Sequence, residues 1–569
     1  MNKAKYWLYI LIFLISIFVY GPLIFKGGFG PMDDLPYIEQ SLDKSNVLQL
    51  TIDRMIYDVD QTGSGGVAAR PVSMLALTIA NVLFRNNPTS YIIIQLSLWF
   101  LGVVFLSYTL KQTLGQRVAM IFLLLGPFPI FSSTIVFSSY YFAEYGLPVF
   151  FWSLSLIFQY KYVINRKLNN YFFGYIFLML GLLSLSIILP LLLVSALLPI
   201  IYENELNDGF TKSDISKFGF RYVLPVVLVA FAFFAFKIYG TRLYNVDSIP
   251  KGLEAGISIK SLLKFGYYFY VILVEVPIML IELIPHLCNW YVLIIGLLLL
   301  SYFAIIRHNT GILSFKSKRT HNKIEKQFIV LVICSLGCGA FIFLISGYPS
   351  VTFGTYNRML IPSFLLFSIL VSYLINKSIN GRWIYLSVVI SFLWISSMII
   401  QINNFIDSWE IRDKVYQDWT EKLNNSNLGP QPYVLACVPF FTRNNYNNEE
   451  VYFAHFFKAG LNLYGAPKID AQVICWRSVA RNDNYITALN FPIDFIKPKN
   501  LWYYEYDRDT GRSKLEKIET QFEIDQKLEE IFFNNINHHP IIFREKILIK
   551  FRELLIKKHD YLEITDDFI

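Results

Sequence analysis

The chain has 569 residues, of which 54% are hydrophobic and only 16% are charged, and its mean hydropathy is +0.44. Ordinary soluble domains carry about 25% charged residues, so this composition excludes a soluble globular protein. The net charge of +8 is modest, and no basic patch with interleaved aromatic residues argues for nucleic acid as a partner.

Apolar runs of about 18 residues or more recur along the chain, and such runs are typical of membrane-spanning helices. The first, from about Tyr6 to Phe25, has no small-residue cleavage site, so we interpret it as a retained anchor. We expect an α-helical polytopic membrane protein with about 11 transmembrane helices, at residues 6–26, 90–110, 117–137, 141–161, 171–186, 187–203, 219–239, 288–307, 327–347, 358–376 and 383–403.

The positively charged loops predict the orientation, because Lys and Arg accumulate in cytoplasmic loops. Lys3 and Lys5 precede the first span, and the loop 308–326 holds five basic residues against one acid, so we expect both to be cytoplasmic. The acidic loop 27–69 and the C-terminal region then lie outside. This orientation requires the apolar segment 263–284 to be re-entrant or a surface helix. If the segment crosses instead, the basic loop is external.

Two adjacent carboxylates, Asp33 and Asp34, stand just past the first span. Carboxylates are costly to hold near lipid, which favours a chemical role. A carboxylate at the outer interface can accept a proton from a hydroxyl nucleophile, or hold a divalent cation beside a phosphate. The structural alternative is a helix N-cap, for which one Asp is enough.

Two single charges lie further along the predicted outer face. Arg70 follows a glycine turn and precedes Pro71, and it could pair with a phosphate or with an acidic loop residue. The alternative is an interfacial Arg that snorkels to lipid headgroups. Glu144 is the only acid between Asp60 and Glu203. We expect it to face water or to meet a cation, because an unpaired carboxylate there is costly.

Arg358 is a lone cation at the predicted outer end of a later span, where positive charge is not needed for topology. A guanidinium with Tyr356 and Asn357 beside it suits a lipid phosphate or pyrophosphate. Snorkelling is again the alternative. The chain has no Walker loop, dinucleotide fingerprint or HExxH motif, which argues against a nucleotide-driven machine in the cytoplasm.

The composition becomes polar after Asn404, and we divide the chain there. Residues 1–404 form the predicted membrane domain, with Asp33 and Asp34 in its external region 27–89. Residues 405–569 contain β-like runs and turn residues, which predict a small extracytoplasmic α/β domain. Outside the cytoplasm, Cys437 and Cys475 could form a disulfide; two separate buried thiols are the alternative.

Taken together, these motifs resemble the GT-C glycosyltransferases, integral membrane enzymes that take sugar from a polyprenyl-phosphate donor. The first external loop of those families opens with Asp-Asp or Asp-Glu, as at Asp33 here. Arg70-Pro71 resembles their Arg-Pro dipeptide, and Arg358 to Ser363 is similar to a later Arg-aliphatic-Pro-Ser stretch. One departure is that some relatives carry a Thr-Glu followed by an Arg-Asp pair, where this chain has Ser-rich sequence and then Glu144. The overall size and topology also resemble phage-type O-antigen glucosyltransferases of Gram-negative bacteria.

The resemblance implies a role for each candidate residue. Asp33 is the expected base, with Asp34 positioning it or sharing a divalent cation, Mg²⁺ or Mn²⁺. Arg358 and Arg70 are expected to hold the donor phosphate. Glu144 and Tyr356 are expected to bind the acceptor or to support the metal.

The resemblance also implies a hexosyltransferase of the bacterial inner membrane, with its active site and C-terminal domain on the periplasmic side. Its partners are expected to be membrane lipid, an undecaprenyl-phosphate-linked sugar donor, and a lipid-linked or surface glycan acceptor such as O-antigen of lipopolysaccharide. An O-antigen ligase or polymerase is an alternative, although such enzymes rely on external Arg and His residues that are few here. A lipid-linked glycan transporter or flippase is a second alternative, disfavoured because the chain lacks inverted hydropathy halves.

Overall fold

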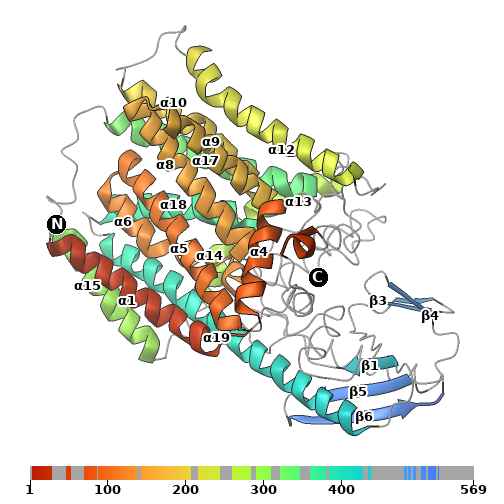
Figure 1. Ribbon diagram of the computed structural model, residues 1–569. Helices are drawn as coiled ribbons and strands as arrows, with labels where there is room; N and C mark the ends of the chain where they lie inside the picture. Colours follow the sequence, from red (N-terminus) through yellow and green to blue (C-terminus); the bar gives the residue numbers. More distant parts are fainter. Residues whose placement is uncertain are drawn as a thin grey trace. The chain divides into compact units, whose positions relative to one another are not determined.

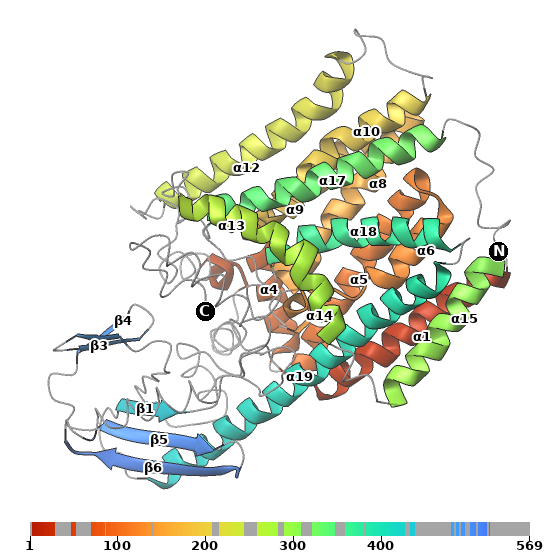
Figure 2. The ribbon, with the colours of Figure 1, turned by 180° about the vertical axis from the view of Figure 1, so that it is seen from behind.

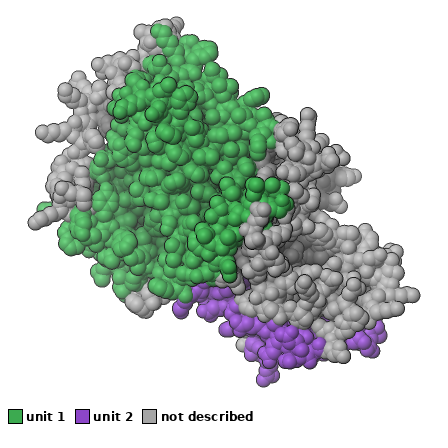
Figure 3. Space-filling model, in the orientation of Figure 1, with its two compact units in different colours: residues 1–25, 45–401 green, residues 26–44, 402–569 purple. Residues whose placement is uncertain are grey.

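A computed structural model of the chain divides into two compact units, Met1–Phe25 with Ser45–Gln401, and Lys26–Lys44 with Ile402–Ile569 (Figure 3). We call them the helical unit and the C-terminal unit and describe each by itself. The structure describes residues 3–28, 47–52, 70–85, 87–137, 142–206, 216–243, 259–282, 290–308, 321–346, 359–379, 383–426, 433–437, 480–482, 485–488, 491–494, 501–507, 510–520 and 523.

The helical unit is a bundle of mostly apolar helices (Figures 1 and 2). Its first half contains α1 (Lys3–Lys26), α4 (Pro71–Phe84), α5 (Pro88–Thr113), α6 (Gln116–Leu125), α7 (Thr134–Phe137), the π-helical turn η1 (Phe142–Gly146), α8 (Leu147–Asn165), α9 (Leu168–Ser184), the 3₁₀ segment η2 (Ser186–Leu191) and α10 (Leu192–Leu206). Its second half contains η3 (Gly219–Val223), α12 (Leu224–Leu243), α13 (Ile259–Tyr270), η4 (Val271–Glu275), α14 (Val276–Glu282), α15 (Trp290–His308), α17 (His321–Ser346), α18 (Ile361–Ser378) and the start of α19 (Ile384–Asn425).

Seven helices among the described residues are long and apolar enough to cross a membrane. The prediction of a helical membrane protein is therefore confirmed at that level. Five shorter apolar helices accompany them, including the segment Phe265–Ile281. The long helices are Tyr6–Lys26, Pro88–Thr113, Phe142–Asn165, Ile187–Asn204, Ser216–Phe236, Ile361–Ser378 and Ile384–Asn425.

The span predicted at residues 117–137 is not one helix. Helix α6 ends at Leu125, and Gly126 and Pro127 follow it. The helix breaks there because Pro127 has no amide hydrogen to donate to a preceding carbonyl. The non-helical stretch that follows is nevertheless buried, including Phe128 and Phe131.

Side chains from three helices satisfy the carbonyls of this non-helical stretch. Tyr20 and Trp99 donate to the Pro127 carbonyl at 2.6 and 3.0 Å. Trp394 Nε1 donates to the Phe128 carbonyl at 3.0 Å, and Gln401 Nε2 donates to the Ile130 carbonyl at 2.7 Å. Irregular backbone is tolerated at membrane depth only where protein groups or water replace the missing helical hydrogen bonds. The bundle therefore supplies what the broken helix lacks.

The segment runs antiparallel to α5 even though it is partly irregular. Gln116 lies just after the end of α5, the Pro127 carbonyl is bound by Trp99, and the Ile135 carbonyl is bound by Gln95 Nε2 at 2.5 Å. Between Gln95 and Thr113 an α-helix advances about 27 Å, close to the hydrocarbon thickness of about 30 Å. The irregular backbone of this segment is the difference from the predicted span.

Ion pairs lie at the far ends of α8 and α18. Arg166, just after α8, forms a bidentate ion pair with the buried carboxylate of Glu203 near the end of α10. Tyr222 in η3 donates to the same carboxylate. Lys377 near the end of α18 pairs with Glu325 near the start of α17. The helices α10, α17 and α18 lie side by side, so these polar contacts gather at one end of the bundle (Figure 2).

The C-terminal unit combines the end of α19 with two small sheets. We expected the last span to end at residue 403, but α19 continues to Asn425. One sheet has the order β1-β5-β6, with β1 (Tyr433–Cys437) parallel to β5 (Leu501–Asp507) and β6 (Arg512–Ile518) antiparallel to β5. The other sheet is antiparallel and contains β2 (Ala480–Asn482), β3 (Tyr485–Ala488) and β4 (Phe491–Asp494).

Candidate functional site

Arg70 stands immediately before α4. Its carbonyl accepts the amide hydrogen of Met74 at 3.0 Å, and Pro71 occupies the first position of the helix. Proline suits this position because it has no amide hydrogen to leave unsatisfied and its φ already fits a helix. The Arg-Pro dipeptide therefore fixes where α4 begins, and it places the guanidinium at that end of the helix.

Glu144 lies in the π-helical turn η1, which leads directly into α8. Such turns are rare and recur at functional sites. Helix α5 approaches the end of this turn closely. A Cβ atom on Gly146 would lie 3.0 Å from Gln95 Oε1 and 3.3 Å from the Leu98 Cβ. The glycine therefore allows η1 to sit against α5.

Arg70 and Glu144 form an ion pair across 74 residues of sequence. The carboxylate side chain is only 5% exposed, and the guanidinium side chain is 20% exposed. Hydrogen bonds between two charged groups are stronger than neutral ones, and they gain further strength away from water. We expected Glu144 to face water or to meet a cation, and the structure shows the second case, with Arg70 of the neighbouring motif as a cationic partner.

Ser73, one turn into α4, ties the pair to the rest of the bundle. Its hydroxyl lies 2.6 Å from the Ala143 carbonyl and 2.7 Å from the Ser184 carbonyl, and can donate to one of them at a time. These carbonyls belong to the residue before Glu144 and to the last residue of α9. The serine therefore joins α4, η1 and α9 beside the ion pair. Sequence reasoning did not single it out, although it stands only two residues after the Arg70-Pro71 dipeptide.

A second buried serine stands in the other Arg-Pro-Ser motif. Ser363, in the first turn of α18, lies 2.7 Å from the Tyr268 hydroxyl, which also lies 2.8 Å from the Leu336 carbonyl. Gly339 allows this approach, because a Cβ there would lie 2.7 Å from the Tyr268 hydroxyl. The serine of each motif is thus a buried contact point between helices, at the first turn of the helix that its motif begins.

Several predicted site residues lie outside the described residues. They are Asp33, Asp34, Tyr356, Arg358 and Cys475. Cys437 is the last residue of strand β1. Its pairing with Cys475 stays a prediction, because Cys475 is outside the described residues. No group of three metal-ligating side chains occurs among the residues that the structure describes. The proposed divalent cation would involve Asp33 and Asp34, so it too stays a prediction.

The described residues that lie nearest in the sequence to Asp33 and Arg358 are closely packed. Gly28 lies against the Trp409 indole within the C-terminal unit, and a Cβ on this glycine would fall 1.7 Å from the ring. The Arg412 guanidinium lies 4.5 Å above the same ring. Close to Arg358 in the sequence, Leu360 is fully buried at the start of α18. The ring centroid of Phe364 lies 6.2 Å from that of Trp99 of α5.

In comparisons with protein-family models, with curated proteins and with solved structures, no match was found.

Proposed function

We propose that the chain is a membrane glycosyltransferase that moves a hexose, with glucose favoured, from a polyprenyl-phosphate sugar to a cell-surface glycan such as O-antigen. The proposed reaction takes place on the periplasmic side of a bacterial inner membrane and inverts the anomeric carbon. The observation that carries the proposal is the Arg70–Glu144 ion pair. It joins two of the candidate residues singled out from the sequence and fixes the Arg70 guanidinium beside a buried carboxylate.

The proposed chemistry is one in-line displacement. The acceptor hydroxyl oxygen bonds to the anomeric carbon, and the bond between that carbon and the phosphate oxygen breaks with its electron pair. The products are the glycoside and polyprenyl phosphate, and the hydroxyl proton passes to a carboxylate. Phosphate departs without being protonated, so the enzyme needs a base and a positive group rather than an acid.

The roles follow from this need. Asp33 takes the proton, and Asp34 positions it or shares a Mg²⁺ or Mn²⁺ ion with it. Arg358 and Arg70 stabilise the charge that develops on the phosphate. A guanidinium has five N–H donors in a planar fork, so one arginine can bind a carboxylate and a phosphate together. Glu144 is then the residue that positions Arg70, and Tyr356 contacts the acceptor.

The proposal includes 11 crossings, a cytoplasmic N-terminus and a C-terminal α/β domain on the periplasmic side. Helix lengths support it. The 24 residues of η1 and α8, Phe142–Asn165, span about 36 Å, slightly more than a hydrocarbon core of about 30 Å. Glu144 and the Arg166–Glu203 pair thus stand at opposite ends of one membrane-length helix. This agrees with a site on one face and basic loops on the other.

The decisive experiment uses purified full-length protein in lipid nanodiscs with undecaprenyl-phosphate glucose and glycan from the host surface. The expected result is release of undecaprenyl phosphate together with glucosylation of the glycan. Asp33→Asn is expected to lower the rate by about 10²–10⁴-fold, the usual contribution of a general base. Asp407→Asn, an exposed aspartate on α19, is the matched control and should keep the wild-type rate. Wild-type rates in both Asp33→Asn and Asp34→Asn would overturn the proposal.

The same assay separates the rival functions. A ligase or polymerase would release a lipid pyrophosphate from a lipid-pyrophosphate glycan and ignore the monophosphate donor. A flippase would move the donor across the bilayer without releasing polyprenyl phosphate.

A further inference from the structure

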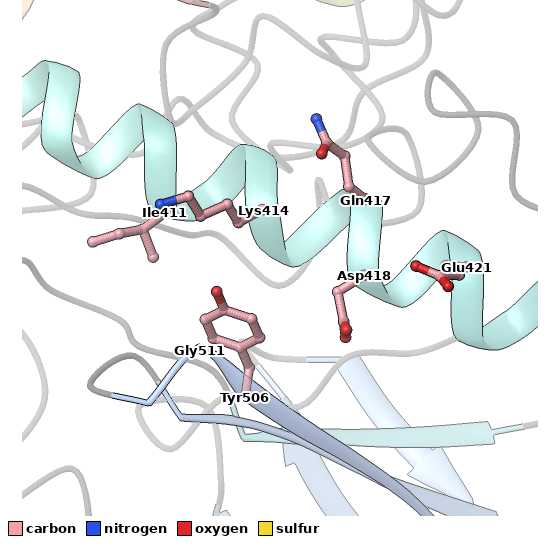
Figure 4. Close-up of a pocket in the computed structure, with 7 residues that line it drawn as sticks. All are labelled: Ile411, Lys414, Gln417, Asp418, Glu421, Tyr506 and Gly511. Atoms are coloured by element: carbon pink, nitrogen blue, oxygen red, sulfur yellow. The ribbon is translucent and has the colours of Figure 1, made fainter.

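The C-terminal unit contains a pocket between the end of α19 and the β5–β6 hairpin (Figure 4). Its volume is about 410 Å³, within the range of about 300–1,000 Å³ typical of ligand pockets. Helix residues supply most of the polar groups, and Tyr506 points from its strand toward the helix (Figure 4). Besides Asp418, the lining consists of Ile411, Lys414, Gln417, Glu421, Tyr506 and Gly511.

The pocket has a fixed frame. The Asp418 carboxylate accepts hydrogen bonds from the Tyr504 hydroxyl and the Ser513 hydroxyl, both at 2.7 Å. The neighbouring Trp419 is fully buried, and its ring centroid lies 4.1 Å from that of Tyr504. These contacts attach the helix to both strands of the hairpin. A frame held in this way lowers the entropy cost of binding, since the walls need not be ordered by the ligand.

The hairpin turn leaves the mouth of the pocket open. Gly511 has a φ of 64°, a conformation that favours glycine. Among the residues that the structure describes, none beyond its chain neighbours has an atom within 4 Å of the position where its Cβ would be. Lys414 and Glu421 are exposed on the helix, and Tyr506 is partly exposed on β5. Their polar groups are therefore accessible from solvent.

The chemistry of the lining selects one class of ligand. The lining contains two carboxylates, Asp418 and Glu421, and one ammonium group, Lys414. This excess of negative charge disfavours phosphate and other anions. Ile411 is its only aliphatic side chain, which is too little for a lipid tail or an apolar peptide. The remaining groups are an amide, a carboxylate, an ammonium and a phenol. They offer both donors and acceptors for neighbouring hydroxyls, beside an aromatic ring that can cover the apolar face of a sugar.

We propose that this pocket binds an uncharged saccharide unit of the acceptor glycan. Glu421 accepts from one sugar hydroxyl, Lys414 donates to a ring or hydroxyl oxygen, and the Tyr506 ring lies against the sugar. Only the name acceptor rests on the proposed glycosyltransferase function. The assignment of a saccharide rests on the pocket itself.

The test is saturation-transfer NMR on the full-length protein in nanodiscs, with oligosaccharides released from the host surface polysaccharide as the probe. Tyr506→Ala and Glu421→Ala are each expected to weaken binding about tenfold, the loss of roughly 1.4 kcal/mol of contacts. Lys517→Ala, an exposed residue of β6 outside the pocket, is the matched control and should bind as the wild type does. Unchanged thermal melting of all variants verifies that each one is folded.

The outcomes separate this inference from the proposed function. Equal binding in the wild type and both pocket variants overturns the saccharide site, as does no binding at all, even if donor turnover is normal. Binding that depends on Tyr506 and Glu421 supports the site even if no polyprenyl phosphate is released. The absence of polyprenyl phosphate release would overturn the proposed transferase. The pocket would then still bind a saccharide, but this saccharide would not be an acceptor. Displacement of the oligosaccharide by a basic peptide at lower concentration would also overturn the saccharide site.

Discussion

The guanidinium of Arg70 binds the carboxylate of Glu144, which lies 74 residues away in the sequence. The carboxylate is the more deeply buried of the two, so it depends on the arginine more than the arginine depends on it. This asymmetry makes the structural and the functional use of the pair separable by experiment.

Arg70→Gln alone is expected to destabilise the helical unit by about 1–3 kcal/mol, because it leaves a buried carboxylate without its cation. Adding Glu144→Gln should recover most of that loss, since two neutral amides need no charge compensation. Transfer activity should not recover, because the phosphate still lacks its guanidinium. Thermal melting and polyprenyl phosphate release measure the two effects. Recovery of activity in the double variant would show that the pair is purely structural.

Gly28→Ala should lower activity by moving the residues that lead to Asp33. The new Cβ would fall 1.7 Å from the Trp409 ring, which Arg412 covers on one face, so the backbone or the indole must shift. Gly21→Ala in α1 is the control, because nothing lies within 4 Å of the position of its Cβ. We expect at least a tenfold lower rate of polyprenyl phosphate release for Gly28→Ala, equivalent to about 1.4 kcal/mol. Equal rates for the two variants would contradict this role of the Gly28–Trp409 contact.

Two glycines of α17 should respond oppositely to the same substitution. Gly339→Ala is expected to destabilise the helical unit by about 1–3 kcal/mol, because its Cβ would lie 2.7 Å from the Tyr268 hydroxyl and 3.2 Å from Ser363 Oγ. Gly337→Ala has nothing within 4 Å and should gain about 0.5–1 kcal/mol of helix stability. Adding Tyr268→Phe to Gly339→Ala should relieve part of the clash. Thermal melting of the four proteins in one detergent checks the order.

The stability of the C-terminal unit should fall at alkaline pH. Burial, together with the hydrogen bond to Asp418, raises the pKa of Tyr504 above its ordinary value of about 10. The folded state therefore keeps a proton that the unfolded state loses, so this contribution to stability is complete below about pH 10. Above that pH it falls by about 1.4 kcal/mol per pH unit. Hydrogen-exchange protection of β5 at about pH 9 and about pH 11 measures the loss. Tyr504→Phe should abolish this pH dependence, whereas Tyr385→Phe, an exposed tyrosine, should retain it.

Hydropathy located most of the helical unit in advance, because the signal of a long apolar helix does not depend on its neighbours. The predicted 90–110 became Pro88–Thr113, and 187–203 lies within Ile187–Asn204. The prediction failed at 117–137, where tertiary donors such as Trp394 and Gln401 allow apolar sequence to leave the helical conformation. It also missed that α19 continues past residue 403, because a helix needs no change of conformation where its surroundings become polar.

The candidate site was predictable in part. A lone acid in an apolar region needs a cation, and this need pointed to Glu144 before its partner was known. That the partner is Arg70 depends on how α4 packs beside η1, which no local pattern contains. Ser73 and Ser363 were overlooked for the same reason. A serine in a helix carries no signal until the carbonyl or hydroxyl that it meets is known.

The irregular segment after α6 also constrains the order in which the helical unit can fold. The carbonyls of Phe128 and Ile130 receive their hydrogen bonds from residues 266 and 271 positions further along. In a newly made chain these two carbonyls lack these donors until α19 is present, because both donors lie on that helix. A chain that ends before Trp394 therefore lacks the side chains that bind these two carbonyls. The segment after α6 is fully hydrogen-bonded only when both α1, which carries Tyr20, and α19 are in place.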